Sequence, residues 1–238
     1  MKTVINQKLI DRNKKLSMVL FFSSMAVLIF GAYLAWPGKA DISRTMYSWI
    51  ALMVGFVLTR ISICFTARFG QTPRYDEVIG QAIEKLRSEY TYFVYSTPVP
   101  MLILGPCRLW LPILVTSSGT ISYIDGKWKH TGISFIRRLM GQEAAADPDK
   151  DVAEASLQIE KQFGLQGIPL EEQPQIQPVV VVLLKNTFIG DVNGAPYPVV
   201  TINDLKRFIR KMDRESCENP IAPEENGKII TALTAGKM

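Results

Sequence analysis

Asp125 and Lys127 are the two side chains of this 238-residue chain whose types and spacing best suit metal-assisted phosphate chemistry. A carboxylate offers hard oxygen ligands to Mg²⁺, and a lysine beside it can position a water molecule and offset phosphate charge. Residues two apart in a strand face the same side, so both side chains are expected in one site if this segment is extended. Asp125-Gly126-Lys127 is also a common turn tripeptide, and a hairpin end or loop is the favoured interpretation.

Two groups of basic side chains offer a second kind of chemistry, the binding of anions. One group lies in the basic and partly apolar segment 126–141, and the other follows the outer face of a helix expected after residue 204. Phosphates of nucleic acid fit such groups, but the anionic inner leaflet of a membrane or a protein partner is favoured for the first group. A solvated helix face is the simplest interpretation of the second. The candidates are Lys129, His130, Arg137 and Arg138, with Lys127 beside them, and then Lys206, Arg207, Arg210 and Lys211.

The composition argues against several other kinds of site. His130 is the only histidine, and Cys64, Cys107 and Cys217 share no metal-like spacing, so a zinc site of the His/Cys type is not expected. A disulfide framework is equally unsupported. No serine or cysteine partner is evident that would make His130 catalytic, and no glycine loop lies at a strand-to-helix junction. The sequence therefore predicts no resident metal or cofactor.

Two apolar runs near the N-terminus, at 17–36 and 46–66, are each about as long as the roughly 20 residues that cross a bilayer as a helix. Together with the loop between them they form a predicted transmembrane hairpin over 17–67. The second run contains Arg60, which is expected to reach the headgroups from near the end of the span, with pairing to a partner subunit as the alternative. The first run is too long for a cleaved signal peptide, and the second follows it at once.

Basic residues predict the side of the membrane on which the polar parts of the chain lie. Five precede the first run, and two, Lys39 and Arg44, lie between the runs. Positive charge near the end of a span marks the cytoplasmic side. We therefore expect a multi-pass protein of the cell (inner or plasma) membrane with both termini in the cytoplasm, and residues 1–16 as a basic cytoplasmic segment. The five are Lys2, Lys8, Arg12, Lys14 and Lys15.

Residues 68–214 are predicted to form one cytoplasmic α/β domain, and residues 215–238 a C-terminal tail in which 229–233 is a candidate short helix. A hairpin turn is predicted at Ser117-Ser118-Gly119. The run 178–184 is of the kind that is buried on both faces of a sheet. The expected order is a helix at 75–90, strands at 91–96, 101–104, 109–116 and 120–125, a helix at 151–163, strands at 178–184 and 197–201, and a basic helix. This order predicts a mixed sheet with flanking helices on both sides.

The order of elements from Tyr75 to Met212 resembles the nuclease-related domain family, a branch of the restriction-endonuclease-like fold. The strongest stretch is Ile113-Leu-Val-Thr-Ser-Ser-Gly-Thr-Ile-Ser-Tyr-Ile-Asp-Gly-Lys127, followed by Trp128 and Gly132. Members of the family have a helix that carries a glutamate, an Asp at the start of a strand, a glycine turn, and a next strand that ends in Glu-x-Lys. The resemblance implies this fold. It also places Asp125, Lys127 and a helix glutamate, Glu77 or Glu84, at the positions of a Mg²⁺-dependent nuclease site.

The chain departs from the family's pattern at the metal ligands. Leu111-Pro112 stands where the family has its strand Asp, Asp125 replaces the usual glutamate, and the helix glutamate aligns only with a shift of one residue. Loss of one of two metal carboxylates is expected to be severe for catalysis, because Mg²⁺ depends on such oxygen ligands. Asp125, Lys127 and Glu77 are therefore interpreted as vestigial.

The sequence thus predicts a non-catalytic, membrane-anchored binding or scaffolding module with a degenerate nuclease-related fold, as an accessory subunit of a membrane complex. Its expected partners are the lipid bilayer and either a membrane protein or a second copy of the chain, and nucleic acid is not favoured. The alternative is a Mg²⁺-dependent nuclease that acts on DNA or RNA at the membrane. Only under this alternative is a cofactor, Mg²⁺, expected.

Overall fold

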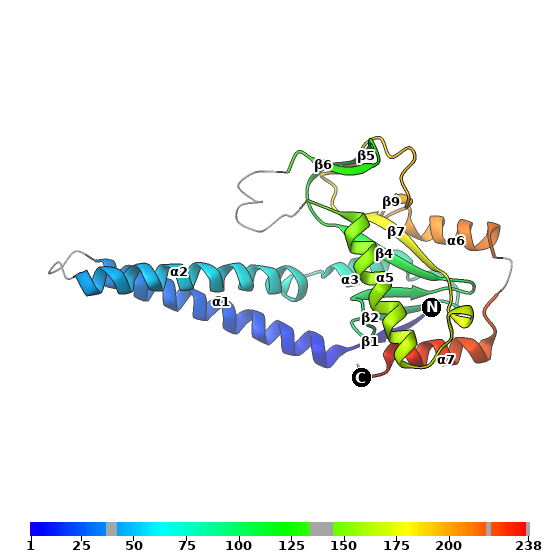
Figure 1. The fold of residues 1–238 in the computed structure, drawn as a ribbon, viewed down its shortest axis with the longest axis horizontal. Helices are drawn as coiled ribbons and strands as arrows, with labels where there is room; N and C mark the ends of the chain where they lie inside the picture. Colours follow the sequence, from blue (N-terminus) through cyan, green and yellow to red (C-terminus); the bar gives the residue numbers. More distant parts are fainter. Residues whose placement is uncertain (37–41, 134–144, 218–219, 237–238) are drawn as a thin grey trace. The chain divides into compact units, whose positions relative to one another are not determined.

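The structure, a computed structural model, describes residues 1–36, 42–133, 145–217 and 220–236. The described chain divides into two compact units (Figure 1). Residues 7–74 form the first, which we call the helix pair. Residues 1–6 and the described chain from Tyr75 onward form the second, which we call the α/β domain.

The helix pair consists of α1 (Gln7–Ala35) and α2 (Ile42–Phe65), followed by a π-helical segment, η1 (Thr66–Gly70). By length and composition α1 and α2 are able to cross a membrane, which confirms the two predicted apolar helices. The first helix begins ten residues before the predicted span, at Gln7, because the polar and basic segment 7–16 is part of the same helix.

Small side chains line the contact between α1 and α2 at intervals of seven residues. Such a repeat keeps one face of a helix against its partner, and small residues let two backbones approach closely. A Cβ added at Gly55 would lie 2.7 Å from Leu28 Cδ2, so any side chain there has to displace Leu28 or move the two helices apart. The Ser48 hydroxyl donates to the Gly31 carbonyl at 2.9 Å. The buried small residues are Ser17, Ser24 and Gly31 on α1, and Ser48, Gly55 and Ser62 on α2.

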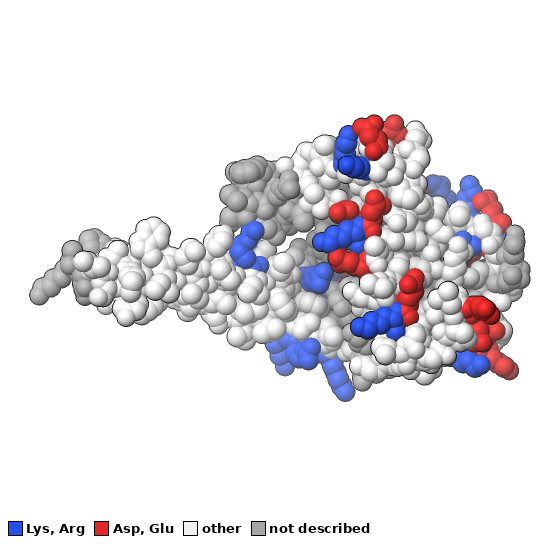
Figure 2. Space-filling view, in the orientation of Figure 1, with Lys and Arg blue, Asp and Glu red and all other residues white. Residues whose placement is uncertain are grey.

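Large apolar side chains cover the outside of the helix pair. Phe22 is 64% exposed, and Trp49 and Met53 are each 67% exposed. In the view of Figure 2 the two helices carry no charged residue over most of their length, whereas the α/β domain shows lysine, arginine, aspartate and glutamate side by side. An apolar surface of this extent needs an apolar environment or a partner that covers it.

A six-stranded mixed sheet, in the order β1-β2-β3-β4-β7-β9, forms the centre of the α/β domain. Its pairs β2–β3 and β3–β4 are antiparallel, while β1–β2, β4–β7 and β7–β9 are parallel. The buried run Val179–Val182 lies between β4 and β9, which confirms the strand predicted at 178–184 as an interior one. The strands are β1 (Lys2–Ile5), β2 (Thr91–Val94), β3 (Met101–Leu104), β4 (Leu109–Val115), β7 (Ile176–Val182) and β9 (Val199–Thr201).

Helices cover both faces of this sheet. Successive side chains of β4 point to opposite faces, so Leu111 packs with the side of α5 and α7, whereas Trp110 meets Phe208 of α6 edge-on at 5.9 Å. The short helix α3 lies beside α6. The predicted arrangement of a mixed sheet with flanking helices is therefore confirmed. The helices are α3 (Tyr75–Ile83), α5 (Pro148–Leu165), α6 (Leu205–Glu215) and α7 (Pro223–Thr234), with a 3₁₀ turn η2 (Leu170–Glu172).

The start of α5 follows from its local sequence. Pro148 occupies the first turn, where its missing N–H is not needed. The Asp147 side chain accepts a hydrogen bond from the Lys150 backbone N–H, which caps the helix. Asp149 and Asp151 place negative charge at the positive end of the helix dipole.

A second sheet, in the order β6-β5-β8, contains β5 (Gly119–Ile124), β6 (Lys127–Thr131) and β8 (Thr187–Ile189). The predicted hairpin turn at 117–119 is wrong, because β4 and β5 belong to different sheets. Gly119, with φ of 115°, instead passes so close to the Thr131 carbonyl oxygen that no side chain fits. The hairpin joins β5 to β6 through Asp125 and Gly126, whose φ values of 56° and 72° are typical of a two-residue turn.

The boundaries of the α/β domain differ from the predicted ones at both ends. Residues 2–5 form β1 on β2, so the segment 1–16 is divided between the sheet and α1. The helix α7 buries Ile229 and Leu233 in the main core, so the described part of 215–238 belongs to the domain and is not a tail. Both elements are short and depend on partners distant in sequence, which local patterns do not reveal. The predicted helix at 75–90 also ends early, at Ile83.

Candidate functional site

Asp125 and Lys127 lie at the tip of the β5–β6 hairpin and not in one extended strand. The Asp125 side chain is 85% exposed, and its Oδ2 is 3.3 Å from the Nζ of Lys129. Lys127 begins β6 and is exposed. Because a turn separates the two residues, the rule for residues two apart in a strand does not apply, and the condition for their expected convergence is not met. The alternative interpretation, a hairpin end, is confirmed.

The other positions of the expected metal site lie elsewhere in the domain. Glu77 is half-buried on α3, whereas Asp125 belongs to the three-stranded sheet (Figure 1). Glu84 follows the end of α3 and is exposed. Leu111 and Pro112 are buried in β4. Among the described residues, no group of three or more His, Cys, Asp or Glu side chains is placed to hold a metal ion.

The predicted basic candidates do not gather on one surface. Lys129 and His130 lie on β6, whereas the second group lies on α6. Within that group Arg207 pairs with Asp204 at 2.8 Å. Lys206 is half-buried, and Arg210 and Lys211 are exposed. Arg137 and Arg138 lie outside the described residues.

His130 connects β6 to two loops. Its Nε2 lies 3.1 Å from the Ser118 carbonyl, to which it donates, and its Nδ1 accepts from the Ala146 backbone N–H at 3.1 Å. The Ser117 hydroxyl lies 3.4 Å from Nδ1, so a serine neighbour exists, contrary to the expectation from sequence. Ser117 is only 2% exposed, and the Ala146 N–H already occupies Nδ1. These contacts assign His130 a structural role in positioning β6.

A buried polar cluster centred on Asp213 of α6 was missed by the sequence patterns. Asp213 Oδ2 accepts hydrogen bonds from Tyr90 Oη at 2.6 Å and from Trp110 Nε1 at 3.2 Å. Its Oδ1 lies 3.4 Å from Arg108 Nε, an ion pair without hydrogen-bond geometry. Asp213 and Arg108 are each 6% exposed. We call Tyr90, Arg108, Trp110 and Asp213 the Asp213 cluster.

Three different parts of the chain position the Asp213 cluster. Tyr90 precedes β2, Arg108 and Trp110 flank the start of β4, and Asp213 comes from α6. Gly105 leaves the space that they need, because a Cβ there would lie 3.1 Å from Asp213 Oδ2 and 3.2 Å from Tyr90 Cε1. The Arg108 guanidinium also lies 5.6 Å from the centre of the Trp110 ring, a cation–π distance. These contacts show that the side chains of the Asp213 cluster pack tightly against one another and against Gly105.

Burial is the main influence on the pKa values of the two acids in the Asp213 cluster. Desolvation raises the pKa of the Asp213 carboxyl, and the hydrogen bonds from Tyr90 and Trp110 and the charge of Arg108 oppose this in part. Desolvation also raises the pKa of the Tyr90 hydroxyl, and its hydrogen bond to Asp213 raises it further. Tyr90 therefore remains a protonated donor at neutral pH.

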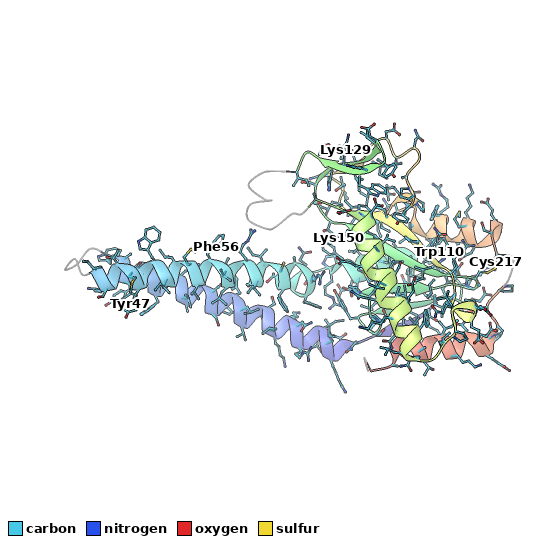
Figure 3. The ribbon with its side chains drawn as sticks, in the orientation of Figure 1. Tyr47, Phe56, Trp110, Lys129, Lys150 and Cys217 are labelled. Atoms are coloured by element: carbon cyan, nitrogen blue, oxygen red, sulfur yellow. A yellow bond between two sulfur atoms is a disulfide. The ribbon has the colours of Figure 1, made fainter. Side chains whose placement is uncertain are left out.

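A disulfide between Cys107 and Cys217 lies next to the Asp213 cluster. The two Cα atoms are 5.7 Å apart, within the usual range, although the cysteines are 110 positions apart in the chain. The bond joins the β3–β4 connection to the residue that follows the C-cap of α6, and both Cys217 and Trp110 are labelled in Figure 3. Arg108 donates to the Ser216 carbonyl at 2.8 Å, so a hydrogen bond reinforces the same connection. This disulfide was not expected from the sequence, because no local pattern relates the two cysteines.

A recess of about 410 Å³ opens beside the Asp213 cluster, and we call it the arginine recess. Arg87, Arg210 and Arg214 are exposed at this recess. Among the described residues, none of the three forms an ion pair. Of the predicted basic candidates that the structure describes, only Arg210 lies here, and Arg87 and Arg214 join it because folding brings the end of the α3–β2 connection to α6. The full lining is Arg87, Glu89, Tyr90, Pro106, Arg210, Asp213 and Arg214.

Comparisons of the chain with protein-family models, with curated proteins and with solved structures found no match. The resemblance to the nuclease-related domain family therefore stays a prediction from sequence.

Proposed function

We propose that this chain is a membrane-anchored, non-catalytic binding module that serves as an accessory subunit of a membrane complex. The observation that carries the proposal is the surface of the helix pair, which presents large apolar side chains such as Phe22 and Trp49 outward along both helices. In a bilayer these side chains contact lipid, and each helix satisfies its own backbone hydrogen bonds. The α/β domain then remains in water beside the membrane.

The surroundings of the nuclease-like residues support a role without catalysis. Asp125 is committed to a turn and to an ion pair with Lys129. Leu111 and Pro112, which stand in place of a metal carboxylate, are buried in the central sheet. A site that cleaves phosphodiesters needs convergent oxygen ligands for its metal ion, and the described positions of these residues do not supply them.

The proposed orientation places both termini in the cytoplasm. It rests on the excess of basic residues before the apolar run 17–36 over those between the two apolar runs. The disulfide between Cys107 and Cys217 argues in the opposite direction, because disulfides are rare in reducing compartments. With a cytoplasmic domain, this bond is expected to be reduced or reversible in the cell.

Cysteine labelling decides the orientation. Leu157→Cys on the exposed face of α5 and Ile42→Cys at the start of α2 are compared in a chain without its native cysteines. A membrane-impermeant maleimide applied to intact cells is expected to label Ile42→Cys and to reach Leu157→Cys only after permeabilisation. The reverse pattern would show an external α/β domain and contradict the proposed orientation.

Isolation of the native protein in mild detergent tests the binding role. We expect the chain to remain in the membrane fraction after alkaline carbonate extraction and to copurify with a stoichiometric membrane protein and without nucleic acid. Copurification of nucleic acid without such a partner would overturn the accessory role.

A cleavage assay with Mg²⁺ tests the nuclease alternative. The purified chain is expected to leave DNA and RNA intact, and Asp125→Ala and Lys127→Ala are expected to behave as the unmodified chain does. Mg²⁺-dependent cleavage that both substitutions abolish would establish a nuclease and overturn the non-catalytic proposal.

A further inference from the structure

Among the described residues, the lining of the arginine recess carries more positive than negative charge. Three arginines line it, against two carboxylates, Glu89 and Asp213. Asp213 is already engaged by the Asp213 cluster, where Arg108 supplies its counter-charge. Arg87, Arg210 and Arg214 therefore line the recess with Glu89 as the remaining carboxylate of the described lining.

The chemistry of these side chains suits one class of ligand. Arginine presents a planar fork of N–H donors that matches phosphate oxygens, and it stays charged at any physiological pH. Arg210 and Arg214 are four residues apart on α6, so they lie on the same helix face. Like charges at this spacing repel each other, and an anion between them removes the repulsion.

The recess also stands on rigid parts of the domain. Between Arg210 and Arg214 in sequence, Asp213 fixes α6 to Tyr90 and Trp110. The hydrogen bond from Arg108 to the Ser216 carbonyl holds the C-terminal end of the same helix, and it does not depend on whether the disulfide beside it is formed. A site built on elements held in this way keeps its donors in place before a ligand arrives, which reduces the entropy lost on binding.

We propose that the arginine recess binds a phosphate group, carried either by a lipid headgroup or by a soluble phosphate ester. The volume of about 410 Å³ lies within the range of small-molecule sites, so the recess holds a headgroup or a small metabolite and not a segment of polymer. This inference deepens the proposed function and rests on it, because it names the ligand chemistry of the α/β domain as a binding module.

Calorimetric titration of the purified full-length chain in a non-ionic detergent tests the inference. The probes are pyrophosphate, short-chain phosphatidylglycerol and short-chain phosphatidylcholine, whose choline group adds a positive charge that the recess disfavours. We expect saturable binding of pyrophosphate, weakened about tenfold or more by Arg210→Gln or by Arg214→Gln, because each removes charge-assisted hydrogen bonds.

Arg207→Gln is the matched control on the same helix. Arg207 is exposed but pairs with Asp204 and does not line the recess, so its loss is expected to leave the affinity unchanged. The unfolding temperature of each variant shows that the chain is folded. Equal weakening by Arg207→Gln and Arg210→Gln would show general charge attraction and overturn the inference.

The probes also separate the two sources of phosphate. Binding of pyrophosphate and phosphatidylglycerol, or of phosphatidylglycerol alone, supports a lipid headgroup, and binding of pyrophosphate alone supports a soluble phosphate ester. Absence of binding by any probe to the folded chain would overturn the inference. These titrations contain no partner protein, so their failure is distinguishable from failure to isolate a membrane-protein partner.

Discussion

In the helix pair the buried side chains are small, such as Ser24 and Gly55, and the exposed ones are large and apolar, such as Phe22. In the α/β domain the pattern is reversed, with Trp110 and Phe93 fully buried and the charged residues outside. The reversal shows that different forces hold the two units together. Within lipid, burial of apolar surface adds little, so helices associate through close contact and hydrogen bonds. In water, burial of apolar surface is the dominant force.

The Asp213 cluster is one place where the α/β domain departs from its own pattern. It buries an ion pair and two hydrogen bonds among apolar neighbours, and a buried ion pair is costly to desolvate even when it is well formed. Its retention beside the arginine recess fits a role in holding α6. The comparison between the two units can therefore be tested by changing the interior of each.

The largest expected effect comes from Asp213→Ala, which leaves the Arg108 guanidinium buried without a counter-charge. We expect a loss of about 3–5 kcal/mol in the free energy of unfolding of the α/β domain. Denaturant unfolding followed by near-ultraviolet circular dichroism measures it. Arg207→Ala is the control, because Arg207 is exposed and its ion pair with Asp204 lies at the surface, and we expect it to cost less than about 1 kcal/mol. Equal losses in the two variants would mean that the cluster is not a buried unit.

Removal of the disulfide is expected to have the next largest effect. The double variant Cys107→Ser, Cys217→Ser is expected to lose about 2–4 kcal/mol, because the bond closes a long loop and limits the unfolded chain. A reducing agent should lower the stability of the unmodified chain by a similar amount and leave the double variant unchanged. Cys64→Ser, at an exposed position outside the bond, serves as the control. No response of the unmodified chain to reduction would count against the disulfide.

Gly55→Leu tests the close contact in the helix pair. A side chain at Gly55 collides with Leu28, so the helices must separate, at an expected cost of about 1–3 kcal/mol. The readout is oxidative cross-linking between Ser17→Cys and Thr66→Cys, whose native hydroxyls lie 2.9 Å apart, in a chain with Cys64→Ser. Val57→Leu enlarges an outward side chain and should leave the cross-linking yield unchanged. An undiminished yield with Gly55→Leu would show that the small residues do not set the contact.

Tyr90→Phe is expected to have the smallest effect, a loss of about 0.5–1.5 kcal/mol at neutral pH from one hydrogen bond. The folded-state pKa of Tyr90 is raised by burial, so this contribution is fully present below the unfolded pKa of about 10. It is lost as pH rises through the folded pKa. Unfolding free energies of both chains, measured from neutral to alkaline pH, should therefore converge above pH about 10. A difference that grows with pH would contradict the assigned donor role of Tyr90.

Local patterns in the sequence predicted much of the fold but little of the arginine recess. The apolar runs predicted α1 and α2, and the β-branched run 178–184 predicted β7. These predictions succeed because the length and the side-chain types of one continuous segment are enough to indicate each element. Arg210 was noted as part of a basic helix face. Its neighbours Arg87 and Arg214 were not noted as ligand-binding candidates, because a helix pattern says nothing about a loop brought to it by folding.

The same limit explains the corrections. β1 forms only because β2 offers an edge for it, so four residues next to a basic helix carried no strand signal. The hairpin turn was assigned to Gly119, although this glycine is required by close approach to Thr131 in another strand. In both places the conformation of a residue depends on a neighbour that is distant in sequence.

The sequence by itself determined two long apolar helices and most of the strands and helices that follow. These features follow from the composition and from hydrophobic patterns that repeat every few residues. Only the tertiary structure decided that Tyr90 and Asp213, 123 positions apart, share a hydrogen bond, and that Cys107 and Cys217 meet beside them. Such contacts depend on how sheets and helices pack, and packing joins residues whose spacing along the chain carries no signal.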